Sequence, residues 1–317
     1  MAAEPVPLVI MGGGRWGRVW ATVVSQARGT GQDVTLVARS NTDETRSWVD
    51  NQIGIQNLKV YKSLEEALAN KPPSGAAIVA TRARDHVADA TAAMNSGLDV
   101  LVEKPLSDIA TRGMELVSVA RRANRLLTIG TEFAFLPVFH SFARTICGDA
   151  GITTARLTWD DPAGELRHGE LKRVHREIGV LIDLMPHAYS IFRIFSGNST
   201  LMITDFDQDI EKESGHIQLQ DETGARYQLR CSKRSAMRKR LLEVEGPQQT
   251  VRIDFRTKHP KVVVDGESMS IPVTSQMTST LRLELGAFLS ERAGAIGSSP
   301  ISDSIPELLA LQAVLEG

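Results

Sequence analysis

Apolar and polar positions along the chain follow two patterns, and the change comes near residue 130. Before it, short apolar runs alternate with segments whose apolar positions recur at helical spacing. The apolar runs predict six strands, at Pro7–Met11, Asp33–Ala38, Lys59–Tyr61, Gly75–Ala80, Val100–Val102 and Leu127–Gly130. The segments between them predict helices at Gly17–Ala27, Ser63–Ala69, Val87–Ser96 and Ile109–Ala123. Strands joined by crossover helices indicate a doubly wound α/β Rossmann domain over residues 1–130.

Beyond residue 130, segments of alternating polarity with turn residues between them predict antiparallel strands. These strands are expected at Gly215–Leu219, Arg226–Arg230, Val251–Phe255 and Lys261–Asp265. Helical spacing predicts helices at Asp183–Phe195 and Thr280–Glu291, and a terminal helix after the Ser- and Pro-rich segment Gly297–Pro306. We therefore expect residues 131–317 to form an α+β domain, with the last helix packing back on the first domain.

Composition narrows the class of partner. The chain has 317 residues, 42% of them hydrophobic, which is enough to bury the cores of two ordinary domains. Its net charge of -2, from 36 basic and 38 acidic residues, gives no global attraction to nucleic acid or to an anionic membrane. A small-molecule partner fits better. No apolar stretch is long enough to span a bilayer and no secretory signal is visible, so we expect a cytoplasmic protein.

The two cysteines, Cys147 and Cys231, lie far apart and lack the spacing of a zinc site or a redox pair. We expect both to be unpaired, inert packing residues in a reducing compartment. The histidines outside the motifs below are scattered without ligand spacing, so we predict no metal site.

A glycine-rich turn follows the first predicted strand. Gly12, Gly14 and Gly17 form Gly-x-Gly-x-x-Gly, and the residues after them are expected to form a helix. The first glycine permits a tight turn, the second lets the backbone approach a pyrophosphate, and the third lets helix and strand pack closely. The helix N-terminus attracts the phosphate charge. This context predicts dinucleotide binding, with Arg15 and Trp16 of the same turn among the contacts.

The end of the second predicted strand indicates which dinucleotide is bound. An NAD-binding site usually offers a carboxylate there for the ribose 2'-hydroxyl, but this chain has Arg39 and Ser40 instead. An arginine forms charge-assisted hydrogen bonds to a 2'-phosphate, and a serine adds a further donor. We therefore expect NADP(H) to be favoured over NAD(H). The alternative is that Arg39 is simply solvated at the end of a strand.

The fifth predicted strand ends in Glu103-Lys104-Pro105, at the edge of the sheet where open α/β sheets bind ligands. Pro105 restricts Lys104 to an extended backbone, and the bond between them is a candidate cis peptide. Lys104 is thus a candidate for contact with cofactor or substrate. A structural lysine paired with Glu103 is an equally good interpretation from position alone.

Asp183 and His187 lie four residues apart, which places them on one face if the segment is helical. A histidine titrates near neutral pH and suits a general acid or base. Pro186 favours the first turn of a helix, so the alternative is a helix that begins near Asp183, with that side chain as its cap.

Together these motifs resemble the family of glucose-fructose oxidoreductase, inositol dehydrogenase and their relatives. The resemblance rests on Gly12-x-Gly14-x-x-Gly17, on Ala80-Thr81 followed by His86, on Glu103-Lys104-Pro105, and on Asp183-x-x-x-His187. It implies a Rossmann domain followed by an open, mostly antiparallel sheet that serves substrate binding and oligomerisation. It also implies that Lys104 and His187 flank the nicotinamide and the reacting carbon, with Asp183 in support. The implied cofactor contacts further include Ala80, Thr81, Arg82, His86 and Glu103.

Two departures from that family weaken a simple sugar as substrate. Arg82 and Arg84 follow the fourth strand, where many relatives have Pro-Asn, and the segment 131–137 lacks the basic residue common in sugar-active relatives. The charged run before Asp183 offers Arg167, His168 and Lys172 as substrate contacts, although such a run is more often a solvated face. A second basic stretch is expected to form a solvent-facing or subunit-facing edge: Lys233, Arg234, Arg238, Lys239 and Arg240.

The leading hypothesis is an NADP(H)-dependent oxidoreductase that transfers hydride between nicotinamide C4 and a carbonyl, alcohol, imine or amine carbon of a small polar substrate. One alternative is a sugar or cyclitol dehydrogenase that uses NAD(H). An alternative of another class is a catalytically silent dinucleotide sensor, since the family also contains a regulatory protein. An uncovered sheet face would favour a homodimer or homotetramer.

Overall fold

The computed structural model describes the chain except for residues 1–5, 29–33, 53, 56–57, 70–74, 148–150, 165, 168–169, 172–177, 198, 258, 271–279 and 295–301. For residues 28, 147, 166–167 and 170–171 only the backbone is described. The chain forms two compact units. The first comprises Met1–Thr131 and Leu281–Pro306, and the second comprises Glu132–Thr280 and Glu307–Gly317.

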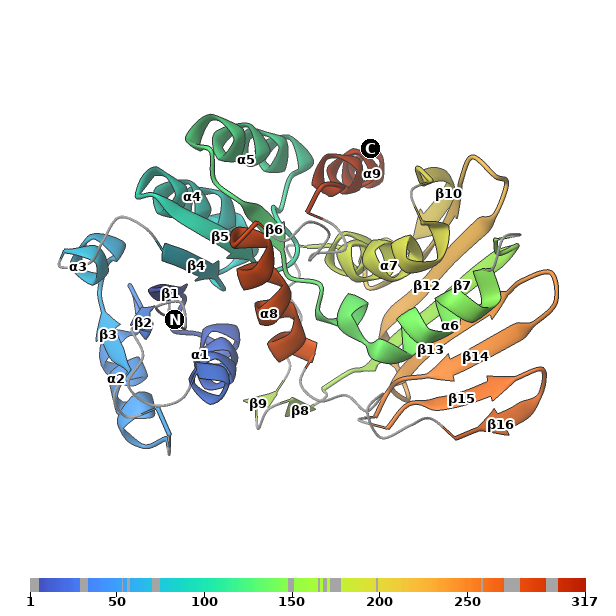
Figure 1. Ribbon diagram of the computed structural model, residues 1–317, viewed down its shortest axis with the longest axis horizontal. Coiled ribbons are helices and arrows are strands. Elements are labelled where there is room, and N and C mark those ends of the chain that lie inside the picture. The colour runs from blue at the N-terminus through green and yellow to red at the C-terminus, as the bar shows by residue number, and fades with distance from the viewer. Residues whose placement is uncertain are drawn as a thin grey trace. The chain divides into compact units, whose positions relative to one another are not determined.

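The first unit is built on a six-stranded parallel sheet (Figure 1). Its strands are β1 (Leu8–Met11), β2 (Val34–Val37), β3 (Lys59–Tyr61), β4 (Gly75–Val79), β5 (Leu98–Val102) and β6 (Leu127–Ile129). They lie in the order β3-β2-β1-β4-β5-β6, which is the order of a dinucleotide-binding Rossmann sheet. All six predicted strands are confirmed, because continuous apolar runs are typical of strands that are buried on both faces.

Helices lie on both sides of this sheet (Figure 1). They are α1 (Arg15–Arg28), α2 (Thr42–Asp50), α3 (Leu64–Leu68), α4 (Ala83–Asn95), α5 (Ala110–Ala123) and α8 (Thr280–Arg292). Helix α2 was not predicted, because two of its three buried residues are Thr42 and Thr45 and it therefore shows no clear apolar stripe.

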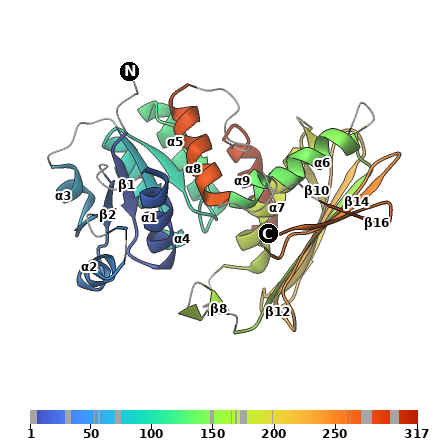
Figure 2. The same ribbon diagram turned by 60° about the horizontal axis from the view of Figure 1, so that its bottom comes forward.

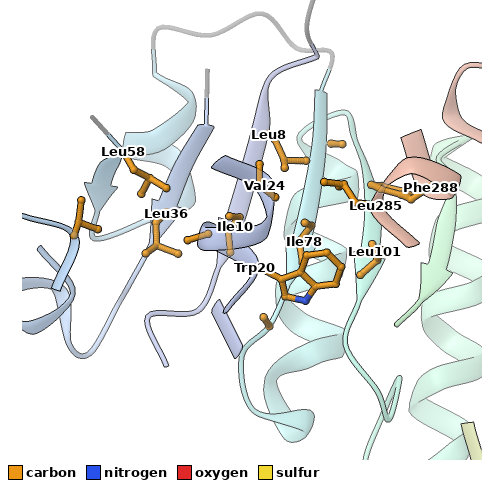
Figure 3. Packing of buried hydrophobic residues seen from close by; sticks show 14 residues of the cluster. Leu8, Ile10, Trp20, Val24, Leu36, Leu58, Ile78, Leu101, Leu285 and Phe288 are labelled. Atoms are coloured by element: carbon orange, nitrogen blue, oxygen red, sulfur yellow. The ribbon is translucent and has the colours of Figure 1, made fainter. Parts of the chain in front are cut away.

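One hydrophobic cluster joins helices from distant parts of the chain to the sheet (Figure 3). Leu8 and Ile10 of β1 and Trp20 of α1 are fully buried in it, and Leu285 and Phe288 of α8 are at most 2% exposed. Burying each such side chain contributes about 1.5–3 kcal/mol. The cluster explains why Leu281–Pro306 belongs to the first unit although it is far away in the sequence.

The second unit contains an eight-stranded open sheet in the order β10-β11-β12-β7-β13-β14-β15-β16. Its strands are β7 (Thr154–Pro162), β10 (Met202–Gln208), β11 (Ser214–Gln220), β12 (Arg226–Ser235), β13 (Lys239–Glu245), β14 (Thr250–Asp254), β15 (Lys261–Val264) and β16 (Glu267–Met269). Strands β7 and β12 pair in parallel, and the other neighbours in this sheet pair antiparallel. The expected open, mostly antiparallel sheet is confirmed.

The remaining elements of the second unit are helical or very short. They are η1 (Glu132–Phe135), α6 (Pro137–Cys147), α7 (Val180–Ser196), α9 (Ile305–Glu316), β8 (Leu166–Arg167) and β9 (Glu170–Leu171). Helices α6 and α7 lie on one side of the large sheet (Figure 2). Helix α6 was not predicted, because the change of texture after residue 130 suggested strands there.

The C-terminal part of the chain differs from the expectation that the last helix packs on the first domain. That role falls to α8, whereas Glu307–Gly317 with most of α9 belongs to the second unit. Within that unit the Glu307 carboxylate accepts a hydrogen bond from the Leu201 backbone N–H at 2.8 Å. No helix in the described part of the chain is long and apolar enough to cross a membrane.

Candidate functional site

The glycine turn of the first unit is closed on one side and open on the other. Gly12 has φ +126°, and a Cβ there would lie 2.5 Å from the Ala80 carbonyl oxygen. A Cβ on Gly17 would lie 1.6 Å from the Gly12 carbonyl oxygen. A Cβ on Gly14 would meet no atom within 4 Å. Two glycines are thus required for packing, and the third leaves open space at the surface of the turn.

Helix α1 begins directly after this open position. It starts at Arg15, and the Arg18 backbone N–H donates to the Gly14 carbonyl at 3.0 Å. The first backbone N–H groups of a helix have no partner within the helix and carry partial positive charge. Open space at Gly14 beside these donors fits the pyrophosphate of a dinucleotide, so the residues present suit this group.

A residue of the turn that we did not predict is Gly13. Its carbonyl accepts hydrogen bonds from Asn41 Nδ2 at 2.9 Å and from Arg18 Nε at 3.2 Å. A Cβ on Gly13 would lie 2.5 Å from both Asn41 Oδ1 and Thr45 Oγ1. Gly13 is therefore needed where α2 comes close to the turn. The run of three consecutive glycines was the available signal.

Arg39 is neither fully solvated nor fully available to a ligand. Its Nη1 lies 2.7 Å from Asp89 Oδ1, and its Nη2 donates to Asp89 Oδ2 at 3.0 Å. The Arg39 side chain is 54% exposed, whereas that of Asp89 is 3% exposed. Thr81 Oγ1 donates to the same carboxylate at 2.7 Å. The guanidinium thus stands at the edge of the sheet, held from one side, next to the exposed Ser40.

Asp89 was missed at the sequence level. It lies in α4 among the buried Ala90, Ala93 and Met94, so an acid at a position in phase with an apolar stripe was the signal. Acids are almost never fully buried unless they are paired. Asp89 of α4 thus connects Arg39, which follows β2, with Thr81, which follows β4.

The loop after β4 is tied to the loop after β5 through His86. This residue is buried, with Nδ1 2.8 Å from the Pro105 carbonyl and Nε2 3.2 Å from the Thr81 carbonyl. Burial lowers the pKa of His86, although both carbonyls oppose that shift. Ala80 is also buried, whereas Arg82, at the N-cap of α4, is exposed. Of these residues Arg82 offers the most accessible side chain.

Glu103 and Lys104 follow β5 at the same edge of the sheet. Glu103 is buried and accepts a hydrogen bond from Trp20 Nε1 at 2.7 Å. Burial raises the pKa of the Glu103 carboxyl above its ordinary value, and the bonds from Trp20 and Lys104 only partly offset this. Lys104 is half-buried, and the Lys104–Pro105 peptide bond is cis. Glu103 thus interacts both with Trp20, through a hydrogen bond, and with the positive charge of Lys104.

In the second unit, α7 carries Asp183 and His187 on one face. The helix begins at Val180 with Gly179 at the N-cap, so the alternative in which Asp183 is the cap is wrong. Asp183 instead lies in the first turn, with Pro186 inside the helix. Its Oδ2 is 3.3 Å from Lys233 Nζ of β12.

His187 is packed between aromatic rings from two other elements. Its ring stacks on Trp159 of β7, with centroids 5.3 Å apart and an interplanar angle of 10°. The edge contact with Phe133 of η1 has centroids 5.1 Å apart at 90°. On Trp159 the Arg240 guanidinium lies 4.0 Å from the ring centroid, and Arg240 also forms an ion pair with Asp161.

The expectation that the second basic stretch faces solvent or a subunit is wrong for two of its members. Lys233 is 6% exposed and Arg240 is 1% exposed, whereas Arg234 and Lys239 are exposed. The reason is strand alternation, because Lys233 is in phase with the buried Cys231 on β12. The alternation along β12 could be read from the sequence, but the positive charge of Lys233 favoured an outward position.

The described cysteine behaves as expected for a packing residue. Cys231 is unpaired and buried, and burial raises its pKa to about 12. Such a thiol is not reactive near neutral pH. The side chain of Cys147 lies outside the described residues.

The structure places the sequence-predicted site residues in two sets. The expected cofactor contacts, from the glycine turn to Lys104, all belong to the first unit, at or just after the carboxyl ends of its strands or at the start of α1. Asp183 and His187 belong to the second unit. Of the expected substrate contacts, Arg167 is described by its backbone in β8, and His168 and Lys172 lie outside the described residues.

Comparison with known proteins assigns the first unit. Residues 6–131 match the model of the oxidoreductase family with the NAD-binding Rossmann fold. The match confirms the resemblance drawn from the motifs and confirms the prediction of an NAD(P)-dependent oxidoreductase at the level of the family. No curated protein matches the sequence.

Solved structures of similar fold cover both units of this oxidoreductase. UDP-N-acetylglucosamine 3-dehydrogenase GnnA from Acidithiobacillus ferrooxidans is 17% identical with a TM-score of 0.76, over 98% of this chain and 96% of that one. The 3-ketoreductase KijD10 from Actinomadura kijaniata, in complex with NADP and TDP-benzene, is 17% identical with a TM-score of 0.75, over 99% and 98%. GenD2 from gentamicin A biosynthesis, in complex with NAD, is 20% identical with a TM-score of 0.73, over 99% and 94%. At these identities the likeness shows the fold.

Proposed function

We propose that this protein is an NADP(H)-dependent oxidoreductase that transfers hydride between nicotinamide C4 and a carbonyl, alcohol, imine or amine carbon of a small polar substrate. The observation that carries the proposal is the glycine turn, with Gly12 and Gly17 closed by backbone atoms and open space at Gly14 beside the start of α1. That arrangement has little structural purpose unless a ligand approaches the backbone there.

The bound cofactor supplies or accepts the hydride, and the chain has to orient the reactants and manage one proton. In this proposal Lys104 stabilises the negative charge that develops on the substrate oxygen or nitrogen. His187 exchanges the proton with that atom, because its ordinary pKa is close to neutral. Asp183 supports His187 or accepts a hydrogen bond from the substrate.

The preference for NADP(H) rests on Arg39 and Ser40. Arg39 is half exposed, and its guanidinium has five N–H donors, of which Asp89 engages those on one side. The remaining donors are suited to a 2'-phosphate. KijD10 was solved with NADP and GenD2 with NAD, so the fold accommodates both cofactors. Substitution Arg39→Asp should lower the ratio of NADPH to NADH efficiency, and an unchanged ratio would remove the basis for this preference.

The substrate screen should begin with nucleotide-linked sugars and their keto forms. The reason is that GnnA is named for UDP-N-acetylglucosamine and KijD10 is a 3-ketoreductase solved with a TDP compound. Keto acids, imines and free cyclitols complete the panel. The keto acids are included because Arg82 is exposed near the cofactor loops and is suited to an anionic group.

Absorbance at the reduced-nicotinamide band measures turnover, with NADPH supplied for the keto compounds and imines and NADP+ supplied for the sugars and cyclitols. We expect at least one member of the panel to be reduced or oxidised, with Lys104→Met and His187→Ala lowering kcat by about a hundredfold or more. The matched controls replace the same residue types outside the candidate site. They are Lys62→Met, at an exposed lysine, and His216→Ala, at a half-buried histidine, and both should retain activity. Tight NADPH binding without turnover of any compound would instead support the silent sensor.

The quaternary structure is a separate part of the proposal. Helices α6 and α7 lie on one face of the large sheet, and outward residues such as Arg226 and Arg230 of β12 are exposed. We expect this outer face to support a homodimer or homotetramer. Light scattering after size-exclusion chromatography measures the molar mass, and a monomer at all concentrations would contradict the expectation.

A further inference from the structure

Lys233 is a lysine in a position where the strand pattern calls for an apolar side chain. The inward residues of β12 are Tyr227, Leu229 and Cys231, with exposures of 0%, 1% and 2%, and Lys233 continues the series at 6%. Helix α7 packs on this part of the sheet. Lysine is almost never fully buried unless it is paired, so the residue requires a partner under the helix.

The partner is the carboxylate of Asp183, whose Oδ2 lies 3.3 Å from Lys233 Nζ. The two side chains differ in burial, because Asp183 keeps 25% of its surface exposed. The backbone of Lys233 is fixed as well, since its N–H donates to the Glu213 carbonyl at 2.8 Å. The backbone of Lys233 is thus fixed by the sheet, and its ammonium group contacts the Asp183 carboxylate, which remains partly exposed.

A purely structural purpose does not account well for this pair. Removing two charges from water costs free energy that their attraction often fails to recover, so an ion pair under a helix is weak support for stability. A pair of apolar side chains would fill the space between sheet and helix at lower cost. The retained charge instead fixes where the Asp183 carboxylate lies.

The same sheet also fixes the other candidate residue of α7. His187 is 6% exposed and stacks on Trp159 of β7, the strand next to β12. Trp159 is directly opposite Cys231, two residues before Lys233 along β12. One region of the inner sheet face therefore contacts both Asp183 and His187.

We infer that Lys233 is a positioning residue of the active site, which fixes the Asp183 carboxylate on the helix face that also carries His187. This inference rests on the proposed function, because it assumes that Asp183 takes part in the reaction. It predicts an effect on kcat that acts through Asp183, since misplacing a catalytic group by about 1 Å can cost a hundredfold in rate.

The test compares Lys233→Met, Lys233→Gln, Lys233→Arg, Asp183→Asn and the double variant Lys233→Met/Asp183→Asn. Lys239→Met is the matched control, because Lys239 is exposed on β13. NADPH oxidation with the UDP- and TDP-linked keto sugars gives kcat and KM, NADPH titration gives cofactor affinity, and denaturant unfolding gives the stability of every variant. Lys233→Gln keeps an N–H donor and serves if the methionine variant does not fold.

We expect Lys233→Met or Lys233→Gln to lower kcat at least tenfold, with KM and NADPH affinity changed less than threefold. Lys233→Arg should recover most of the loss, since it restores the charge. The double variant should be no slower than Asp183→Asn alone, because the lysine acts through the aspartate. A kcat within twofold of wild type in both uncharged variants, or losses that multiply in the double variant, would overturn the positioning role.

The unfolding measurements separate this inference from the proposed function. Destabilisation by Lys233→Met and by Asp183→Asn should be less than additive in the double variant, since each breaks the same ion pair. Additive effects would show that Lys233 and Asp183 do not stabilise the fold through a shared ion pair. If these effects are less than additive but no compound of the panel is turned over by wild type, the proposed function fails and the positioning role fails with it.

Discussion

Two arginine–aspartate pairs, one in each unit, show how similar chemistry serves different purposes. Arg39 pairs with Asp89 at the edge of the parallel sheet, with exposures of 54% and 3%. Arg240 pairs with Asp161 on the inner face of the second sheet, with exposures of 1% and 5%. Only in the first pair does the cation keep a surface that a ligand can reach.

The other contacts around Arg240 and Arg39 differ in the same way. Arg240 also donates to the carbonyls of Asp160 and Lys239 at 2.7 and 2.8 Å and lies over Trp159. These contacts are all internal, and they hold Arg240 in the packing under α7. We call the glycine turn Gly12–Gly17 together with Arg39 and Ser40 the Rossmann edge. It keeps exposed hydrogen-bond donors and open space at Gly14, which is typical of a binding surface.

The largest effect is expected from Gly17→Ala in the Rossmann edge. Its Cβ would overlap the Gly12 carbonyl, which is backbone and cannot move aside, so we expect a loss of about 3 kcal/mol or more and no NADPH binding. Gly14→Ala is the matched variant, because its Cβ meets no atom within 4 Å. It should keep the unfolding midpoint and weaken NADPH binding at least tenfold. Equal NADPH affinity in Gly14→Ala and wild type would show that no ligand approaches this position.

The next effect comes from the buried pair. Arg240→Met leaves the Asp161 carboxylate buried without its cation, which should cost about 3–5 kcal/mol in denaturant unfolding. Adding Asp161→Leu should recover most of this loss, because the uncompensated charge is removed. A loss below about 1 kcal/mol in Arg240→Met would mean that the pair is effectively solvated.

A smaller effect on stability is expected from the Arg39–Asp89 pair, in which only the arginine is exposed. Arg39→Met leaves the buried Asp89 carboxylate with the Thr81 hydroxyl as a donor and should cost about 1–3 kcal/mol. Its effect on binding should be larger, with NADPH affinity reduced at least tenfold and NADH affinity nearly unchanged, as measured by calorimetric titration. Equal losses for the two dinucleotides would show that Arg39 does not recognise the 2'-phosphate.

The sequence was sufficient for the parallel sheet of the Rossmann unit because its signals are local. Strands β1 and β4 are continuous apolar runs, and Gly12, Gly14 and Gly17 lie within six residues. Asp89 escaped prediction because its partner Arg39 is fifty residues away, a contact that only the parallel pairing of the sheet creates.

The second unit was harder to predict because charge and strand phase conflicted. Lys233 and Arg240 are charged residues at inward positions, and their interpretation depended on Asp183 and Asp161 from other elements. Asp183 and His187 were found through their helical spacing. The start of α7 was not, since Pro186 suggested a later first turn.

The smallest effect concerns pH and Glu103. Burial raises the pKa of this carboxyl in the folded state, so its contribution to stability is full at pH 4 and is lost as the pH rises through the raised value. Glu103→Gln stays neutral and can still accept the bond from Trp20. Thermal unfolding should show the variant more stable than wild type at pH 8, by at most about 3 °C, and no more stable at pH 4. A wild type that is the more stable at pH 8 would contradict the burial argument.

The proposed function requires the Rossmann edge of the first unit to bind NADP(H). Calorimetric titration of the wild-type protein with NADPH and with NADH measures this binding. We expect one site per chain, with NADPH bound at least tenfold more tightly, a difference of about 1.4 kcal/mol, and with this advantage absent in Arg39→Asp. No binding of either dinucleotide, or equal affinity for both, would contradict it.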